Sequence, residues 1–365
     1  MFTPSRLTLA RKRRGLTKKG LAELIGVSTR SITAFESGEL APKPDNLKKI
    51  SEALGFPASF FEAEDLPELA SEAVSFRSLS KMGAAQRHSA LAAGTIAFAL
   101  HDWISDRFKL PAPNVPKLGP GVDPETAAQV VRAEWNLGEK PIPNLIHLLE
   151  VRGVRVFSIT QECRELDAYS LWRGDQPFVF LNTQKSGEHS RFDAAHELGH
   201  LVLHWHHDVP QGRPAEQEAH QFAAAFLMPA QSILATAPRN PSLNQLIKAK
   251  KPWRVSVGAL AHRLHELKVL SDWHYRTLCI EIGNRGYRTN EPEPRIDRET
   301  SQVLNKVFAA LRREGCTNAE IARDLHVNPQ ELEALVFGLA IMPLGESGGV
   351  PARPKLNSYP PLELA

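Results

Sequence analysis

The sequence predicts a multi-domain, mainly α-helical protein with one α+β part, and three observations lead to this fold class. The chain has 365 residues, which is enough for two or three domains that each bury a core. Apolar residues recur at helical spacing over most of its length. Two short runs rich in β-branched and aromatic residues, at 154–159 and 177–182, are typical of strands. We therefore expect helical regions on both sides of a part with a small sheet.

The composition is that of an ordinary globular protein. Hydrophobic residues make up 42% and charged residues 23%, which excludes a disordered or collagen-like chain. The longest apolar stretch, residues 89–100, is too short to cross a bilayer and predicts a buried helix. The three cysteines lie far apart, and the first residues contain no signal-peptide core. We expect a cytoplasmic, nucleoid-associated protein without disulfides and without a membrane partner.

Shifts in composition predict five consecutive segments. A basic helical domain occupies residues 1–65, and a helical linker with a Pro/Gly-rich end occupies 66–121. The α+β part follows at 122–245, and a helical C-terminal domain at 246–342. Residues 343–365 form a Pro/Gly-rich tail.

The positive charge is concentrated at the N-terminus. Residues 1–60 contain 11 Lys and Arg against 5 Asp and Glu, whereas the rest of the chain contains 33 against 36. A compact basic segment on a near-neutral body indicates a nucleic-acid-binding module, because phosphate contacts are electrostatic. Charge alone is equally compatible with a solvated basic face.

Residues 16–38 have the pattern of a helix, a turn and a second helix. Thr17 is an expected N-cap, and Gly26 suits the left-handed conformation that ends a helix. Ser28 is expected to cap the second helix, with Ile32 and Phe35 facing inward. The opposite face is then polar and basic, as an element that enters the major groove requires.

This segment resembles the XRE (Cro-like) helix-turn-helix family over about 55 residues. The resemblance depends on Leu16-Thr17, Leu21-Ala22, Gly26-Val27-Ser28, Ile32, Phe35-Glu36 and Gly38. It implies binding to a double-stranded DNA operator, with a protein-interaction domain of the same fold as the alternative. The family usually has Gln after the capping Thr, where Lys stands here and can reach phosphate. The expected DNA contacts are Lys18, Ser28, Thr29, Arg30, Ser31 and Thr33.

Residues 192–200, Phe-Asp-Ala-Ala-His-Glu-Leu-Gly-His, contain the strongest chemical signal in the chain. His196 and His200 stand four residues apart on one helix face, so both imidazoles can reach one metal ion. Glu197 follows the first histidine, where its carboxylate can take a proton from a metal-activated water. The alternative is a core helix with incidental histidines.

A catalytic zinc site needs a third protein ligand. Residues 216–220, Glu-Gln-Glu-Ala-His, begin a following helix that offers a carboxylate from Glu216 or Glu218. A third histidine at His206 would require glycine at position 203, where Leu203 stands, and this disfavours that arrangement. His204 is expected to pack or to form a hydrogen bond. The run at 177–182 is considered as an edge strand that receives a peptide substrate.

Residues 124–229 resemble the ImmA/IrrE family of zinc metallopeptidases. The specific parts are His-Glu-Leu-Gly-His-Leu-Val-Leu-His and Phe-Ala-Ala-Ala-Phe-Leu-Met-Pro. The resemblance implies a zincin-like fold and a zinc site of His196, His200 and Glu216, with Glu218 as the second choice. Glu197 is then the catalytic base. The same ligands also accept Mn²⁺ or Fe²⁺. The Asn of the family motif is His220 in this chain.

The C-terminal third is expected to pack rather than to perform chemistry. Residues 248–263 resemble a segment found in longer members of the same family. His262 and Glu266 are expected on the surface of an amphipathic helix. Residues 316–332 have the pattern of a second helix-turn-helix, but Glu331 and Glu333 make its second helix acidic and disfavour phosphate contact. We expect this element to pack or to dimerise.

Two functions are compatible with these features of the sequence. The first is a DNA-binding regulator, expected as a homodimer, whose endopeptidase domain cleaves a repressor-type protein. The expected setting is stress, DNA-damage or mobile-element control. In a variant of this function, the peptidase cleaves its own chain within residues 63–86. The second is a non-proteolytic transcription factor or antitoxin-like regulator whose peptidase fold senses a ligand or a metal.

Overall fold

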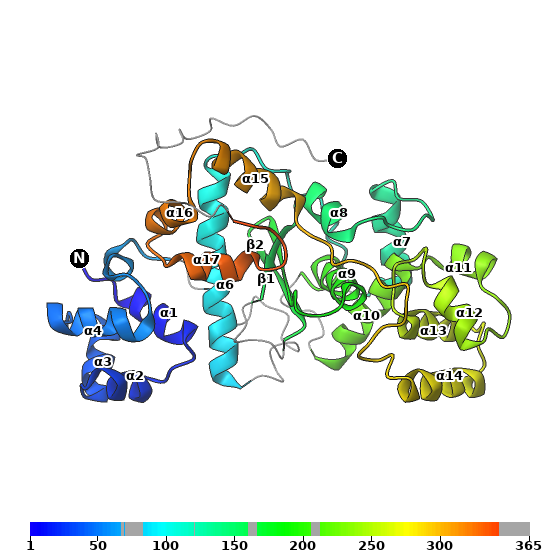
Figure 1. Ribbon diagram of the computed structural model, residues 1–365, viewed down its shortest axis with the longest axis horizontal. Helices are drawn as coiled ribbons and strands as arrows, with labels where there is room; N and C mark the ends of the chain where they lie inside the picture. Colours follow the sequence, from blue (N-terminus) through cyan, green and yellow to red (C-terminus); the bar gives the residue numbers. More distant parts are fainter. Residues whose placement is uncertain (67–68, 70–82, 120, 160–165, 206–211, 343–365) are drawn as a thin grey trace. The chain divides into compact units, whose positions relative to one another are not determined.

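The computed structural model describes residues 1–66, 69, 83–119, 121–159, 166–205 and 212–342 (Figure 1). The predicted tail at 343–365 and His206 lie outside the described residues. Contacts divide the chain into two compact units. Unit 1 comprises Met1–Pro111, Phe157–Leu166 and Ser301–Ala365, and unit 2 comprises Ala112–Val156 and Asp167–Thr300. The mainly helical fold class with a small sheet is confirmed.

The units do not follow the consecutive segments expected from the sequence. The predicted C-terminal domain at 246–342 is divided, because its last helices pack with the N-terminal helices in unit 1 while its first helices belong to unit 2. Contacts between residues hundreds of positions apart cannot be read from local composition. The predicted domain boundaries therefore stay a prediction.

Unit 1 begins with a helix-turn-helix. Thr17 Oγ1 accepts a hydrogen bond from the Gly20 amide (3.0 Å) and caps the first helix. Gly26 ends that helix at a φ of 71°, which favours glycine. Ser28 Oγ accepts from the Ser31 amide (3.1 Å) and caps the second helix, as predicted. The elements are α1 (Pro4–Arg13), α2 (Lys18–Ile25), α3 (Thr29–Ser37), α4 (Pro44–Leu54) and the 3-10 helix η1 (Ala58–Glu62).

The described part of unit 1 contains four more helices: α6 (Ala84–Ser105), α15 (Gln302–Arg313), α16 (Asn318–Asp324) and α17 (Pro329–Val336). The stretch 89–100 forms the buried part of α6, as predicted. Glu331 of α17 accepts from Arg13 Nε (2.8 Å) and Arg14 Nη1 (2.5 Å) of α1. The packing role predicted for the acidic helix is thus confirmed for Glu331.

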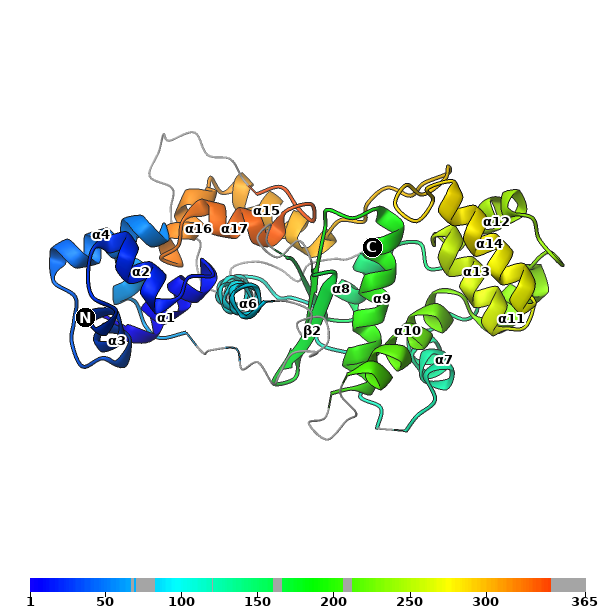
Figure 2. The same cartoon turned by 90° about the horizontal axis from the view of Figure 1, so that it is seen from below.

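Unit 2 contains the site predicted to perform chemistry. Its helices are α7 (Pro124–Glu134), α8 (Leu145–Val151), α9 (Gly187–Leu203), α10 (Arg213–Leu227), α11 (Ala230–Thr236), α12 (Leu243–Ala249), α13 (Val257–Glu266) and α14 (Asp272–Asn284). Helix α9 packs against α10 on one side and against two strands on the other. Helices α11 to α14 gather in one cluster (Figure 2).

The sheet has three strands in the order β1-β3-β2. They are β1 (Arg155–Ser158), β2 (Ala168–Arg173) and β3 (Gln176–Leu181). β2 and β3 are antiparallel, in a register from Ala168↔Leu181 to Arg173↔Gln176. The sequence analysis missed β2, and it was wrong to consider 177–182 as an edge strand. β3 is central because β2, joined to it by a tight turn, occupies its second side.

No described helix is both long enough and apolar enough to cross a membrane.

Candidate metal centre and nucleic-acid interface

Helix α9 carries the two histidines of the chemical motif on one face. Its N-cap is Ser186, whose Oγ accepts from the His189 amide (3.3 Å). Ala195 and Leu198 are fully buried and fix the rotation of the helix against the core. The Nε2 atoms of His196 and His200 consequently lie 3.1 Å apart. Such a separation lets both nitrogens face one ion.

Helix α10 brings a carboxylate to the same point. Glu216 Oε1 lies 3.4 Å from His200 Nε2, and Glu216 Oε2 lies 3.6 Å from His196 Nε2. The two helices approach closely at Gly199, where a Cβ atom would stand 3.0 Å from the Phe222 ring and 3.2 Å from the backbone of Ala219. The glycine inside the motif thus allows the approach that brings Glu216 to the histidines.

The charges of these three groups depend on burial and on one another. Burial lowers the pKa of His200 to about 4, so His200 is neutral at pH 7. Burial opposes protonation of His196 as well, but the carboxylates of Glu216, Glu197 and Asp193 together outweigh burial and raise the pKa of His196. Burial alone would raise the pKa of Glu216, yet hydrogen bonds from both histidines lower it. Glu216 is therefore an anion.

The arrangement fits a divalent cation. One ligand atom from each of His196, His200 and Glu216 lies within 4.8 Å of the others. A neutral imidazole nitrogen and carboxylate oxygens point lone pairs toward the same space, and these repel unless a cation or a proton lies between them. Two histidines and one carboxylate form a ligand set typical of catalytic zinc.

Glu197 lies behind this cluster in an apolar environment. It is 1% exposed, and burial raises its pKa to about 7. Ser170 Oγ of β2 donates a hydrogen bond to Glu197 Oε2 (2.6 Å) and holds the carboxyl group in place. Sequence reasoning missed Ser170 because it missed β2; the run Tyr-Ser-Leu-Trp at 169–172 was the available signal.

Glu218, the second choice for the carboxylate, lies elsewhere. Its Oε2 is 2.9 Å from His204 Nε2, and His204 Nδ1 is 2.9 Å from His200 Nδ1. Glu218 and His204 therefore orient the ring of His200 from the side opposite to Glu216, the support that a metal-binding histidine normally has. The hydrogen-bonding role expected for His204 is confirmed.

A second pair of histidines lies beside the cluster. The His220 ring centroid is 6.5 Å from that of His196 and 5.5 Å from that of His262 on α13. His262 Nδ1 in turn lies 3.5 Å from Glu266 Oε1. His262 and Glu266 lie on the amphipathic helix α13, as predicted, with side chains 40% and 25% exposed, and α13 packs against α10.

The residues expected to contact DNA are gathered at the start of α3. Ser28, Thr29, Arg30 and Thr33 are exposed, while Ser31 is half-buried. Lys18 is half-buried and its Nζ lies 3.4 Å from Glu36 Oε2. Among the described residues, nothing forms an ion pair with Arg30. The exposed face of α3 can thus present a hydroxyl-rich surface with one guanidinium group to a duplex.

Comparisons with protein families agree with the description of both the helix-turn-helix and the region of the candidate metal centre. Residues 7–61 match the family of helix-turn-helix domains. Residues 149–265 match the family described as the IrrE N-terminal-like domain, so the match extends beyond the predicted boundary at 245 and includes most of α13. No protein of curated function matches the chain. Two separate regions of the chain thus match, in this order, an XRE-type helix-turn-helix domain and the ImmA/IrrE-like peptidase family.

Proposed function

We propose that this protein is a DNA-binding transcriptional regulator whose peptidase domain is a zinc-dependent endopeptidase that cleaves a repressor-type protein. The observation that carries the proposal is the convergence of His196, His200 and Glu216 beside a buried Glu197. The helix-turn-helix match at 7–61 supports the DNA-binding half. Stress, DNA damage or mobile-element control is the proposed setting.

His196, His200 and Glu216 would hold the metal, and a bound Zn²⁺ would supply a Lewis acid that activates water and polarises a peptide carbonyl. Mn²⁺ or Fe²⁺ is an alternative occupant of the same ligands.

Glu197 is the proposed general base and acid. A carboxyl group with a pKa of about 7 can accept a proton from the attacking water and can return it to the leaving amine. Ser170 restricts the rotation of that carboxyl group through the 2.6 Å hydrogen bond. The burial that raises the pKa also excludes bulk water from the carboxyl group.

Metal content tests the ligand assignment directly. We expect about one zinc per chain in the wild type by elemental analysis, a loss in Glu216→Ala, and retention in Glu218→Ala. The two substitutions are matched because each removes one carboxylate from the first two turns of the same helix, α10. Retention in Glu216→Ala together with loss in Glu218→Ala would overturn the assignment.

Catalysis and DNA binding are tested with separate variants. Glu197→Gln should abolish metal-dependent cleavage of a repressor-type protein and leave operator binding unchanged. Arg30→Ala should weaken operator binding and reduce its salt dependence, without altering metal content. Binding as a dimer to a two-fold site is expected for a regulator of this type.

The same experiments distinguish the proposed endopeptidase from the second candidate function, a non-proteolytic regulator. If Glu197→Gln retains every regulatory effect in cells, the peptidase fold acts as a sensor in a non-proteolytic or antitoxin-like regulator. If the only fragment formed by the wild type comes from cleavage within residues 63–86, the substrate is the chain itself.

A further inference from the structure

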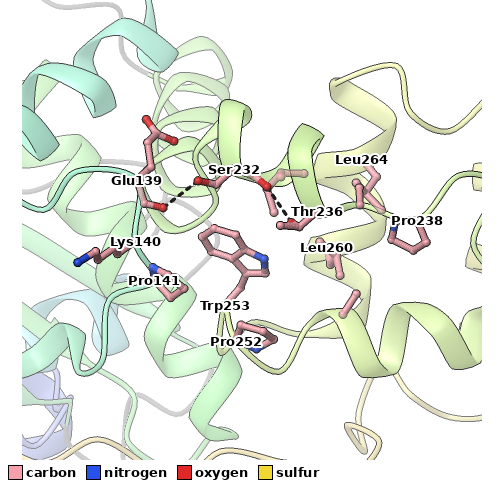
Figure 3. A pocket seen from close by; sticks show the side chains of 13 residues that line it. Glu139, Lys140, Pro141, Ser232, Thr236, Pro238, Pro252, Trp253, Leu260 and Leu264 are labelled. Atoms are coloured by element: carbon pink, nitrogen blue, oxygen red, sulfur yellow. Dashed lines mark hydrogen bonds between the residues drawn. The ribbon is translucent and has the colours of Figure 1, made fainter.

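Unit 2 contains a cavity of about 480 Å³ that the proposed peptidase chemistry does not use (Figure 3). Its walls come from the segment 139–141, from α11, from the end of α12 and the following loop, and from α13. Trp253 lies in the middle of this lining. The size falls within the range of pockets that hold small molecules.

The lining is mainly apolar. Ile233, Leu260 and Leu264 contribute buried side chains, and Pro141, Pro238 and Pro252 contribute ring surfaces. The charged groups of Glu139 and Lys140 point away from the indole, toward the outside of the cavity (Figure 3). An occupant would therefore meet apolar surface on most sides and no charged group at the centre.

The lining also carries polar groups: the hydroxyls of Ser232 and Thr236 donate to backbone carbonyls, and Trp253 contributes an indole N–H. Its side chain is nine-tenths buried, with 6% of the residue exposed. Within the part of the chain that the structure describes, nothing accepts a hydrogen bond from its Nε1–H group, which points toward the Leu260 side of the cavity (Figure 3). The indole N–H groups of Trp103, Trp135, Trp172 and Trp205, by contrast, all donate to an oxygen atom. The Trp253 Nε1 atom itself remains accessible to solvent from the cavity, so an acceptor on a bound molecule can take the place of a water there.

We propose that this cavity, the Trp253 pocket, binds a small, uncharged and largely apolar molecule that carries one hydrogen-bond acceptor. A flat ring can stack on the indole, and a carbonyl oxygen on that ring can accept from Nε1–H. The aliphatic side chains of Ile233, Leu260 and Leu264 bury the rest of such a ligand. A carboxylate or phosphate ligand is disfavoured because no cation faces the centre of the pocket.

Helix α13 connects this pocket with the candidate metal centre. Leu260 and Leu264 face the pocket, whereas His262 lies on another face of the helix, beside His220. His220 follows Glu216 by one turn of α10. Arg263 fastens α13 to the core by donating to the Met228 carbonyl (3.0 Å). A ligand in the Trp253 pocket thus contacts the helix that contributes His262 to the surroundings of the metal centre.

A pair of isosteric probes tests the proposal on the full chain. 2-Acetylnaphthalene carries the required ketone, and 2-isopropenylnaphthalene has nearly the same shape without the acceptor. We expect the ketone to bind once per chain and to shift the indole N–H signal of Trp253 in ¹⁵N-resolved NMR spectra. The hydrocarbon should bind roughly fivefold more weakly, the value of one hydrogen bond. Trp253→Phe should remove this difference between the probes.

A second variant blocks the pocket without altering Trp253. Thr236 lines the pocket and is exposed, so Thr236→Trp should fill its entrance and abolish binding of both probes. Leu234→Trp is the matched control, because Leu234 is 54% exposed on the same helix and does not line the pocket. The proposal is overturned if neither probe binds the wild type, if both bind equally well, or if Thr236→Trp binds them like Leu234→Trp. These measurements do not depend on peptidase activity.

Discussion

The ion pairs between α1 and α17 offer the sharpest test of how unit 1 is held together. Glu331 is 7% exposed in its side chain and contacts both Arg13, which is 2% exposed, and Arg14, which is 26% exposed. Glu331→Ala leaves a buried guanidinium without its carboxylate, and breaking a buried pair in this way costs about 3–5 kcal/mol. Arg14 is partly hydrated and Arg13 keeps a bond to Ser89 Oγ (3.3 Å). We therefore expect Glu331→Ala to lower the free energy of unfolding by the lower end of this range, about 3 kcal/mol.

Trp103 allows this loss to be measured in unit 1 alone. The chain has six tryptophans, and Trp103 is the one that lies in unit 1. Incorporation of 5-fluorotryptophan and ¹⁹F NMR during urea unfolding would report the Trp103 signal separately. With a slope of about 2 kcal/mol per molar urea, the midpoint should fall by about 1.5 M. Gln330→Ala is the matched control, since Gln330 is exposed on the same helix. Equal midpoints in the two variants would refute the reasoning.

Three further outcomes are expected. Gly153→Ala should destabilise unit 2 by more than about 3 kcal/mol in thermal unfolding, because φ is 80° and a Cβ would lie 2.3 Å from a backbone oxygen. Gly174→Ala, with a φ of 60° and open space around the Cβ, should cost only about 1 kcal/mol. Similar losses of stability in the two variants would contradict this reasoning. Burial raises the pKa of Cys316 to about 11, so alkylation at pH 8 followed by mass spectrometry should modify the half-buried Cys279 before Cys316; rapid labelling of Cys316 would count against its burial. Ser28→Ala should cost about 1 kcal/mol of helix stability and weaken operator binding, whereas unchanged hydrogen exchange in α3 would show that the cap contributes nothing.

Local features of the fold could be predicted because their causes lie within a few residues. A hydroxyl at an N-cap position needs only an amide three residues later, as Thr17 and Ser28 show. The placement of His196 and His200 on one face follows from the helical period alone. These effects require no knowledge of what the helix packs against.

The choice between the two carboxylates of α10 needed the tertiary structure. Residues two positions apart on a helix point in different directions, so Glu216 and Glu218 could not both face the histidines. Which of them does so depends on how α10 is rotated against α9, and that rotation follows from the packing of Ala219 and Phe222 at Gly199.

Local sequence patterns are sufficient to identify two chemical modules: a capped helix-turn-helix, and a helix with two histidines and a glutamate. The groups that surround these modules depend on tertiary packing. Ser170 reaches Glu197 because β2 pairs with β3, Glu331 reaches Arg13 across 318 positions, and Trp253 meets Leu260 in a pocket. The physical reason is that helix period and capping act over three or four residues. The partners of a buried polar group are set by long-range packing, which no local pattern encodes.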